Sequence, residues 1–161
     1  MARQPDSLRR PILVCYDGSP AAARAVDAAG SLFPGRVAIV LHVHARVAVE
    51  RVRTTSAAGV RDELIEEVRV AARRDATATA EEGVALARDA GLEARPLLVE
   101  ATEGGTPEAI VRVAIEQSAA AVVVARTSRT RRALRPGGVL RGLVDRCPVP
   151  LVVVSAAQSP G

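Results

Sequence analysis

The stretch from residue 125 to residue 138 reads ARTSRTRRALRPGG and is the part of the sequence best equipped to bind an anion. It holds five arginines, no acidic residue and a terminal pair of glycines. Arginine pairs with phosphate through two parallel hydrogen bonds, and the backbone N–H groups at the start of a helix also attract anions. The stretch is therefore a phosphate-binding loop, a nucleic-acid patch or a solvated basic loop.

Asp17 is the second candidate, because it closes the apolar run PILVCYD and is followed by Gly-Ser-Pro. A carboxylate at the end of a buried strand can contact the ribose or base of a nucleotide. Asp-Gly-Ser-Pro is equally suited to a turn that leads into a helix, with Ser19 as the cap and Pro20 at the first helical position. The residue types alone leave both interpretations open.

The sequence does not support a catalytic or metal site. It contains no lysine, which excludes a Walker A loop, and no GxGxxG motif. His42 and His44 face one side of a strand, but no third metal ligand converges with them. Cys15 lacks a recognisable base and orienting group that would make it a nucleophile. We expect a binding protein without catalytic residues, with weak ATP hydrolysis as the open alternative.

The positive charge of the chain is concentrated in one region. The whole chain carries +4, whereas residues 125–146 contain seven arginines and one acid. This distribution favours a local anionic ligand. Nucleic acid is disfavoured because Tyr16 and Phe33 are the only aromatic residues, too few for a stacking platform. Two cysteines without motif spacing, and no run of ~18 apolar residues, predict a cytoplasmic protein that does not enter a membrane.

The elements that must position these residues alternate between strand and helix. The runs that predict strands are rich in β-branched residues and cover residues 11–17, 36–44, 93–101, 120–126 and 149–156. Near-continuous apolar strands are typical of a parallel sheet covered on both faces. We therefore expect an α/β fold, a doubly wound three-layer sandwich, over residues 11–156, with an N-terminal extension at 1–10 and a C-terminal tail at 157–161.

Helices are predicted after Ser19, over residues 60–90, after Thr106 and after Gly138. Thr106 and Pro107 repeat the cap-and-proline signal, and Gly91 is a helix stop. The positions expected to face the sheet recur at helical spacing: Ala22, Val26, Ala29 and Phe33, then Leu64, Val68, Ala72 and Ala76, then Ile110, Val113 and Ala114.

A doubly wound sheet binds its ligand beyond the carboxyl ends of the strands, where the strand order reverses. With the order 3-2-1-4-5, the reversal falls between the first and fourth strands. Asp17 and Ala125 follow those two strands, so the basic stretch would begin at the ligand crevice.

The sequence resembles the universal stress protein family over nearly all of its length. The matching segments are ILVCYDGSPAAARAVDAA near the start, VLHVH in the second predicted strand, GTPEAIVRVAIEQSAAAVVV, and LVDRCPVPLVVV near the end. The resemblance implies a five-stranded sandwich of order 3-2-1-4-5 that forms a homodimer through the last strand, residues 149–155.

The resemblance also implies a nucleotide site. ATP-binding members carry a glycine, two residues, a glycine, nine residues, a glycine and then serine or threonine. In this sequence those four positions hold Ala125, Ser128, Gly138 and Val139. Arg129 is the first of the nine intervening residues. The family's acidic contact to the adenosine end is present as Asp17, and the residue whose backbone meets adenine is Val43.

These departures predict that nucleotide binding is weakened or lost. If the backbone at Ala125 must adopt positive φ, the strain from its methyl group costs about 1 kcal/mol. Losing a hydroxyl bond to charged phosphate at Val139 would cost roughly 1.5–3 kcal/mol. The alternative is a genuine ATP or AMP site, with Mg²⁺ if ATP binds, in which Arg129 and its neighbours hold the phosphates. A signalling partner is expected in either case.

Overall fold

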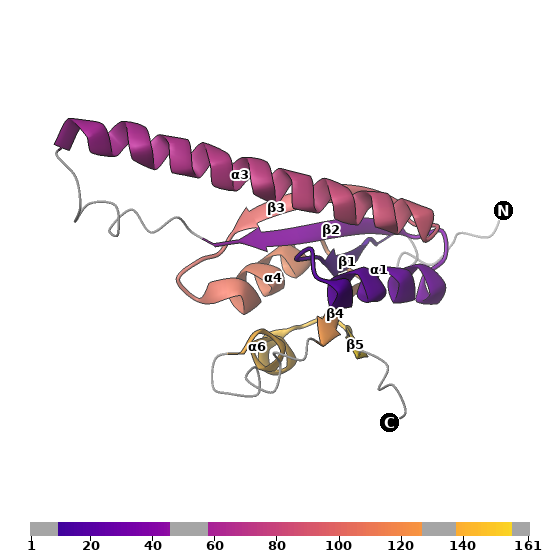
Figure 1. The fold of residues 1–161 in the computed structure, drawn as a ribbon. Helices are drawn as coiled ribbons and strands as arrows, with labels where there is room; N and C mark the ends of the chain where they lie inside the picture. The colour runs from indigo at the N-terminus through magenta and orange to yellow at the C-terminus, as the bar shows by residue number, and fades with distance from the viewer. Residues whose placement is uncertain (1–9, 46–57, 127–137, 156–161) are drawn as a thin grey trace, which may run out of the picture.

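The structure of the protein, a computed structural model, describes residues 10–45, 58–126 and 138–155 (Figure 1). Strands and helices alternate along the chain, as predicted. The elements are β1 (Ile12–Cys15), α1 (Pro20–Leu32), β2 (Val37–His44), α3 (Ala58–Asp89), β3 (Glu93–Glu100), α4 (Gly105–Glu116), β4 (Ala121–Arg126), α6 (Val139–Arg146) and β5 (Leu151–Ser155).

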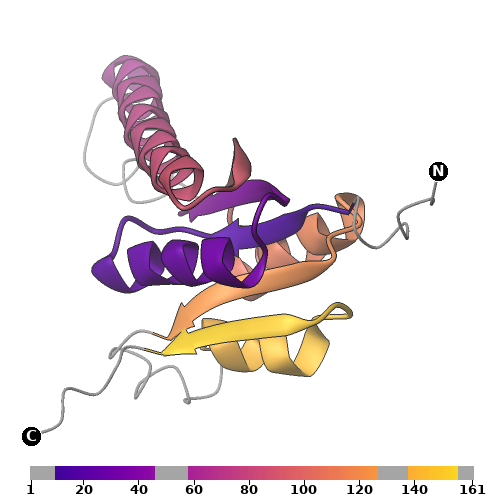
Figure 2. The same ribbon diagram turned by 90° about the vertical axis from the view of Figure 1, so that its right-hand side faces the viewer.

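The five strands form one parallel sheet in the order β3-β2-β1-β4-β5. Val14 of β1 lies beside Val40 of β2 on one side and Val123 of β4 on the other. Helices α1 and α3 cover one face, and α4 and α6 cover the other (Figure 2). The predicted α/β fold class and strand order are confirmed.

The core consists of two aliphatic layers that share the sheet. In β1, Ile12 and Val14 face α1 and α3, whereas Leu13 faces α4 and α6, and all three are fully buried. Because the sheet is covered on both faces, its central strands need apolar residues at every position. This requirement explains the near-continuous apolar runs, and each strand lies within its predicted range.

Helix α1 begins as predicted. The Ser19 hydroxyl accepts a hydrogen bond from the Ala22 N–H at 3.1 Å, and Pro20 occupies the first helical position. Ala22, Val26 and Ala29 are buried on the predicted face, and Phe33 packs against the same core layer. The cap and the proline thus fix where the chain turns from β1 into the helix.

Helix α3 has the predicted extent, but the stripe predicted to face the sheet is wrong. Gly91 follows the helix with φ 84°. Leu64 is 40% exposed and Val68 is 39% exposed, and of the predicted positions Ala76 alone is buried. The buried side chains of α3 within the described range are Ile65, Ala76, Ala80, Val84 and Ala87. The start of α3 extends past the end of β2, so the first turns of the helix have no strand beneath them (Figure 1).

Helix α4 starts before the predicted cap. Its N-cap is Gly104, without a side-chain hydrogen bond, and the helix begins at Gly105. The Gly105 N–H bonds to the Thr102 carbonyl at 2.9 Å, and Gly105 has φ 78°, which glycine adopts at little cost. The chain has therefore already turned before Thr106, and the prediction of Thr106 as a cap is wrong. Ile110, Val113 and Ala114 are buried as predicted.

The chain ends are described only in part. Arg10, the last residue of the predicted extension 1–10, donates hydrogen bonds to the carbonyls of Ser118 at 2.7 Å and Ala119 at 3.1 Å. The rest of that extension and the predicted tail 157–161 lie outside the described residues. The proposed boundaries at residues 10 and 156 therefore stay predictions.

Candidate functional site: a crevice at the ends of β1 and β4

A crevice of about 230 Å³ opens at the carboxyl ends of the strands on the α4 and α6 side of the sheet. Its walls come from β1, β2, β4 and the first turns of α4 and α6, and include Cys15, Asp17, Val43, Thr106, Ala125 and Val139. The parallel pairing of β1 with β4 brings Asp17 and Ala125 to the same edge of the sheet. The crevice thus lies at the predicted reversal of strand order.

Asp17 lies in the turn between β1 and α1 and lines the crevice. Its Oδ1 accepts a hydrogen bond from the Ser19 N–H at 3.0 Å, and the intervening Gly18 has φ 78°. The side chain is exposed. This bond uses one carboxylate oxygen and leaves the other without a partner among the described residues. The turn role is therefore present, and one carboxylate oxygen remains available as an acceptor at the lining of the crevice.

The β2 side of the crevice is apolar. Leu41 is buried and Val43 is half-buried, and both point to the same side of the sheet as Ile110 of α4. Thr106, a half-buried residue in the first turn of α4, also lines the crevice. Sequence reasoning assigned Thr106 to a cap and missed it as a lining residue. This wall suits the flat apolar faces of a heteroaromatic ring.

The β4 side of the crevice is formed by Ala125, Val139 and Leu140. Gly138 caps α6 with φ −68° and ψ 144° and makes no side-chain cap bond. Any residue adopts these angles, so backbone conformation alone does not require glycine there. Val139 is 39% exposed and has no hydroxyl. Ser128 and Arg129 lie outside the described residues.

The chain matches the family model described as "Universal stress protein family" over residues 9–155. It belongs to the universal stress protein family. A search among curated proteins finds no match.

Solved structures share the fold over nearly the whole chain. A universal stress protein family member from Burkholderia pseudomallei is 21% identical, with a TM-score of 0.66 and coverage of 94% of this chain and 100% of that one. A universal stress protein in complex with cAMP is 20% identical, with a TM-score of 0.62 and coverage of 93% and 99%. The universal stress protein from Archaeoglobus fulgidus in complex with dAMP is 25% identical, with a TM-score of 0.56 and coverage of 91% and 98%.

Within this universal stress protein, four of the residues singled out in the sequence meet in one place. Asp17, Val43, Ala125 and Val139 all line the crevice, and Gly138 directly precedes Val139. They come from four different segments, which only the sheet order brings together.

Cys15 lines the crevice as a neutral thiol. Burial raises its pKa to about 12, and the charges of Cys147 and Asp17 add to the effect. A nucleophilic cysteine needs the opposite shift, because the thiolate is the reactive form. Both cysteines are free. The structure therefore gives no support to covalent chemistry at Cys15.

Tyr16 connects the crevice to the opposite face of the sheet. Burial raises the pKa of its phenol to about 12, with a hydrogen bond to Glu82 contributing. The Nδ1 atom of His42 lies 2.9 Å from the Tyr16 carbonyl oxygen. This contact joins His42 of β2 to the end of β1 and stabilises the position of Tyr16. Among the residues that the structure describes, no group of three His, Cys, Asp or Glu could hold a metal ion.

No helix within the described ranges is both long and apolar enough to cross a membrane.

Proposed function

We propose that this universal stress protein is a stress-response binding and signalling module, and that its crevice holds an adenine nucleotide mainly by the adenosine end, without turnover. The observation that carries the proposal is the convergence of Asp17, Val43 and Ala125 on one crevice at the strand-order reversal. We place the protein in the cytoplasm, where its two free thiols are kept reduced.

The base and ribose end of the crevice supports this proposal. Leu41, Val43 and Ile110 supply an apolar wall of the kind that buries a purine ring. Asp17 offers a carboxylate oxygen to ribose hydroxyls, and hydrogen bonds to a charged acceptor are among the stronger ones. Two proteins of the same fold are described in complex with cAMP and with dAMP, which contain the same adenosine-like end.

The other end of the crevice, next to Ala125 and the start of α6, is where the phosphates would lie, and it should bind them weakly. Asp17 is the one charged side chain among the described residues that line the crevice, and its charge repels phosphate. Val139 lacks a hydroxyl, and the missing bond to phosphate would weaken binding by roughly tenfold to a hundredfold. The uncapped N–H groups at the start of α6 remain as donors. A triphosphate, with the most negative charge, should gain least from this end.

Calorimetric titration with adenosine, AMP and ATP, each with and without Mg²⁺, tests the proposal. Adenosine and AMP should bind with similar affinity, and ATP should bind no tighter than AMP. Asp17→Ala should weaken all three ligands, while Asp27→Ala, an acid on α1 outside the crevice lining, should leave them unchanged. No heat and no change in Tm at millimolar concentrations of all three would overturn the proposal, and phosphate release from ATP would overturn the absence of turnover.

The second candidate function is a genuine ATP site completed by arginines. Arg126 is exposed at the end of β4, next to Ala125, so the basic stretch starts at the rim of the crevice. ATP binding tighter than AMP, lost in Arg126→Ala and Arg129→Ala, would favour this second function. Binding of nucleic acid is not proposed.

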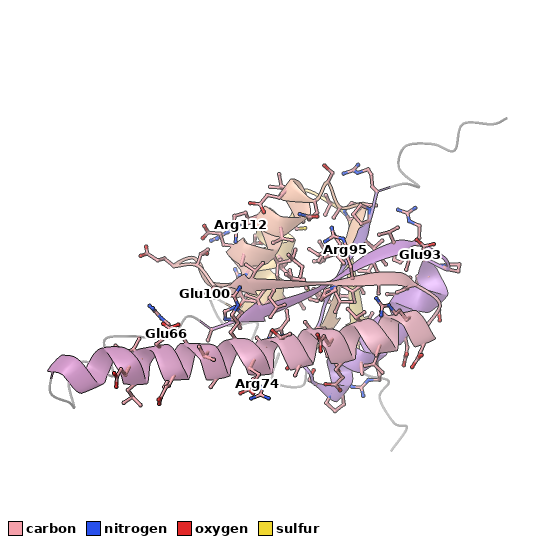
Figure 3. The ribbon with its side chains drawn as sticks, turned by 90° about the horizontal axis from the view of Figure 1, so that it is seen from above. Glu66, Arg74, Glu93, Arg95, Glu100 and Arg112 are labelled. Carbon is pink, nitrogen blue, oxygen red and sulfur yellow. The ribbon has the colours of Figure 1, made fainter. Side chains whose placement is uncertain are left out.

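We also propose that the protein forms a homodimer through β5. The two edge strands of the sheet differ: β3 carries Pro96 and the charged residues Glu93, Arg95 and Glu100, which discourage pairing with another strand (Figure 3). The β5 sequence LVVVS has no charge, and Val153 is 37% exposed. Pairing of β5 with a second copy would bury this edge in a two-fold interface.

A further inference from the structure

Helix α3 carries an exposed face, centred on Val70, that lies away from the core. Val70 is 59% exposed. At 100° per residue it lies about 120° around the helix from the buried Ala76. Figure 3 looks down on α3 and labels Glu66 and Arg74, which lie one turn before and one turn after Val70. Val70, Glu66, Glu67 and Arg74 are among the residues that line one hollow in this surface.

Charged side chains flank Val70 in an order that changes sign at Val70. Glu66 and Glu67 lie four and three residues before it. Arg73 and Arg74 lie three and four residues after it. Residues three and four apart share one face of a helix, so these four side chains lie on the same face as Val70. All of them are exposed. The face is therefore acidic on one side of Val70 and basic on the other.

These charges are little used within α3 itself. Among the described residues of this face, Glu66 meets Arg69 at 4.0 Å, and both side chains are more than half exposed. An exposed ion pair at this distance contributes little to stability. Glu67, Arg73 and Arg74 form no ion pair with another described residue. The face thus presents two carboxylates and two guanidinium groups to a partner.

A second α3 that runs in the opposite direction matches this order of charges. In an antiparallel crossing at Val70, the residue four positions before Val70 faces the residue four positions after it in the other copy. Glu66 then faces Arg74 of the second copy, and Glu67 faces Arg73 of the second copy. Two-fold symmetry repeats both ion pairs around the two valines. A parallel crossing would place carboxylates against carboxylates and arginines against arginines, which is repulsive.

We propose that the face centred on Val70 is an interaction surface for a second copy of this chain, with the two α3 helices antiparallel across a two-fold axis at Val70. This contact differs from the proposed β5 interface, because α3 packs on β2 and β3, and β3 and β5 are the opposite edges of the sheet. A chain with both contacts links dimers into larger assemblies. The inference does not depend on nucleotide binding.

The contact should be weak and sensitive to salt. Exposed ion pairs stabilise an interface only slightly and are screened by ions. We therefore expect the α3 contact at low ionic strength and high protein concentration, and the proposed β5 dimer as the dominant species at ordinary ionic strength. This salt dependence separates the two contacts experimentally.

Cysteine cross-linking of the full-length chain tests the position of the axis. Val70→Cys places two thiols opposite each other, so oxidation in air with copper phenanthroline at low salt should give disulfide-linked dimers. Val68→Cys is the matched control, because Val68 is a 39% exposed valine on the other side of the same helix. It should cross-link about tenfold more slowly, since a disulfide needs Cβ atoms about 4 Å apart. The unaltered chain gives the background from Cys15 and Cys147. Equal rates for the two variants, or a Val70→Cys rate at background, would overturn the proposal.

Charge reversal tests the orientation of the two helices, with Val70→Cys present in every protein. Adding Glu66→Arg and Glu67→Arg should abolish cross-linking, because arginines then face arginines. Adding Arg73→Glu and Arg74→Glu instead should also abolish it. A mixture of these two variants should cross-link again, since each basic pair then faces an acidic pair in the other variant. A mixture that stays uncross-linked, or a variant that cross-links with itself at the original rate, would refute antiparallel pairing.

The salt dependence of the same reaction tests the ion pairs. Raising the ionic strength from about 0.01 M to about 1 M shortens the screening length from about 30 Å to about 3 Å. The cross-linking rate of Val70→Cys should fall towards that of Val68→Cys over this range. A rate for Val70→Cys that does not change with salt would contradict an interface held by these charges.

Discussion

Gly83 of α3 lies directly against the ring of Tyr16. A Cβ atom built at Gly83 would lie 2.6 Å from Cδ1 of Tyr16 and 2.8 Å from Cγ1 of Val40. Tyr16 sits between Cys15 and Asp17, two residues of the crevice. The contact therefore couples the packing of α3 on one face of the sheet to the position of the crevice residues Cys15 and Asp17.

Gly83→Ala should lower the free energy of unfolding by about 1–3 kcal/mol, because the added methyl overpacks a contact that involves a ring and a strand side chain. This loss should exceed the gain of up to about 1 kcal/mol that alanine brings to a helix interior. Urea denaturation measures the change. Glu81→Ala, at an exposed position of the same helix, is the control and should leave stability unchanged or slightly raised. An unchanged midpoint for Gly83→Ala would contradict the close packing.

Stability should fall as the pH rises above 9. The folded chain raises the pKa of Cys15 from 9.0 to about 12 and that of Tyr16 from 10.0 to about 12. The unfolded chain loses these protons first, so the stabilisation is complete below pH 9 and is lost as the pH approaches 12. Urea denaturation from pH 8 to pH 11.5 measures the slope. Cys15→Ser and Tyr16→Phe, which remove the titrating groups, should each flatten it, and slopes equal to that of the unaltered chain would contradict the assignment.

Val139→Ser should strengthen ATP binding by about tenfold or more, because it adds a hydroxyl donor where the phosphates would meet α6. The affinity for adenosine should not change, since adenosine has no phosphate. Val144→Ser is the matched control, because Val144 lies on the same helix, is 64% exposed and does not line the crevice. Calorimetry with ATP and adenosine on the three proteins gives the comparison. An equal effect of both substitutions, or a gain for adenosine as well, would count against a phosphate end at α6.

Val153→Glu should convert the proposed homodimer into a monomer, because it places like charges on the edge strand proposed to pair with its own copy. Sedimentation velocity at several protein concentrations measures the mass. Val37→Glu, a similarly exposed valine at the start of β2, should leave the mass unchanged. A monomeric unaltered chain, or a Val153→Glu protein that remains dimeric, would refute the interface at β5.

Local signals in the sequence predicted much of this molecule. The apolar runs predicted the strands, and Ser19 with Pro20 predicted the start of α1. These features depend on residues adjacent in the chain: a buried parallel strand needs an apolar side chain on both faces, and a cap needs a hydroxyl beside the first turn. The family resemblance added the sheet order and so placed Asp17 near Ala125.

Other features depended on contacts between distant segments. The stripe of Leu64 and Val68 has the helical period of a buried face, yet it is exposed because α3 is longer than the strand it covers. Helical period reports which residues share a face and carries no information on where the neighbouring sheet ends. The turn at Gly105 likewise moved the start of α4 ahead of the predicted cap.

The sequence by itself determined the alternation of strand and helix, the apolar layers and the residue types available for a site. The tertiary structure decided which of those residues meet. Thr106 follows β3 in the chain, but it lines a crevice with Asp17 of the β1–α1 turn and Ala125 of β4, because α4 crosses to the face that those strands share with α6. A side chain acquires its neighbours from the packing of whole elements, and that packing is set by the sum of many contacts rather than by any local pattern.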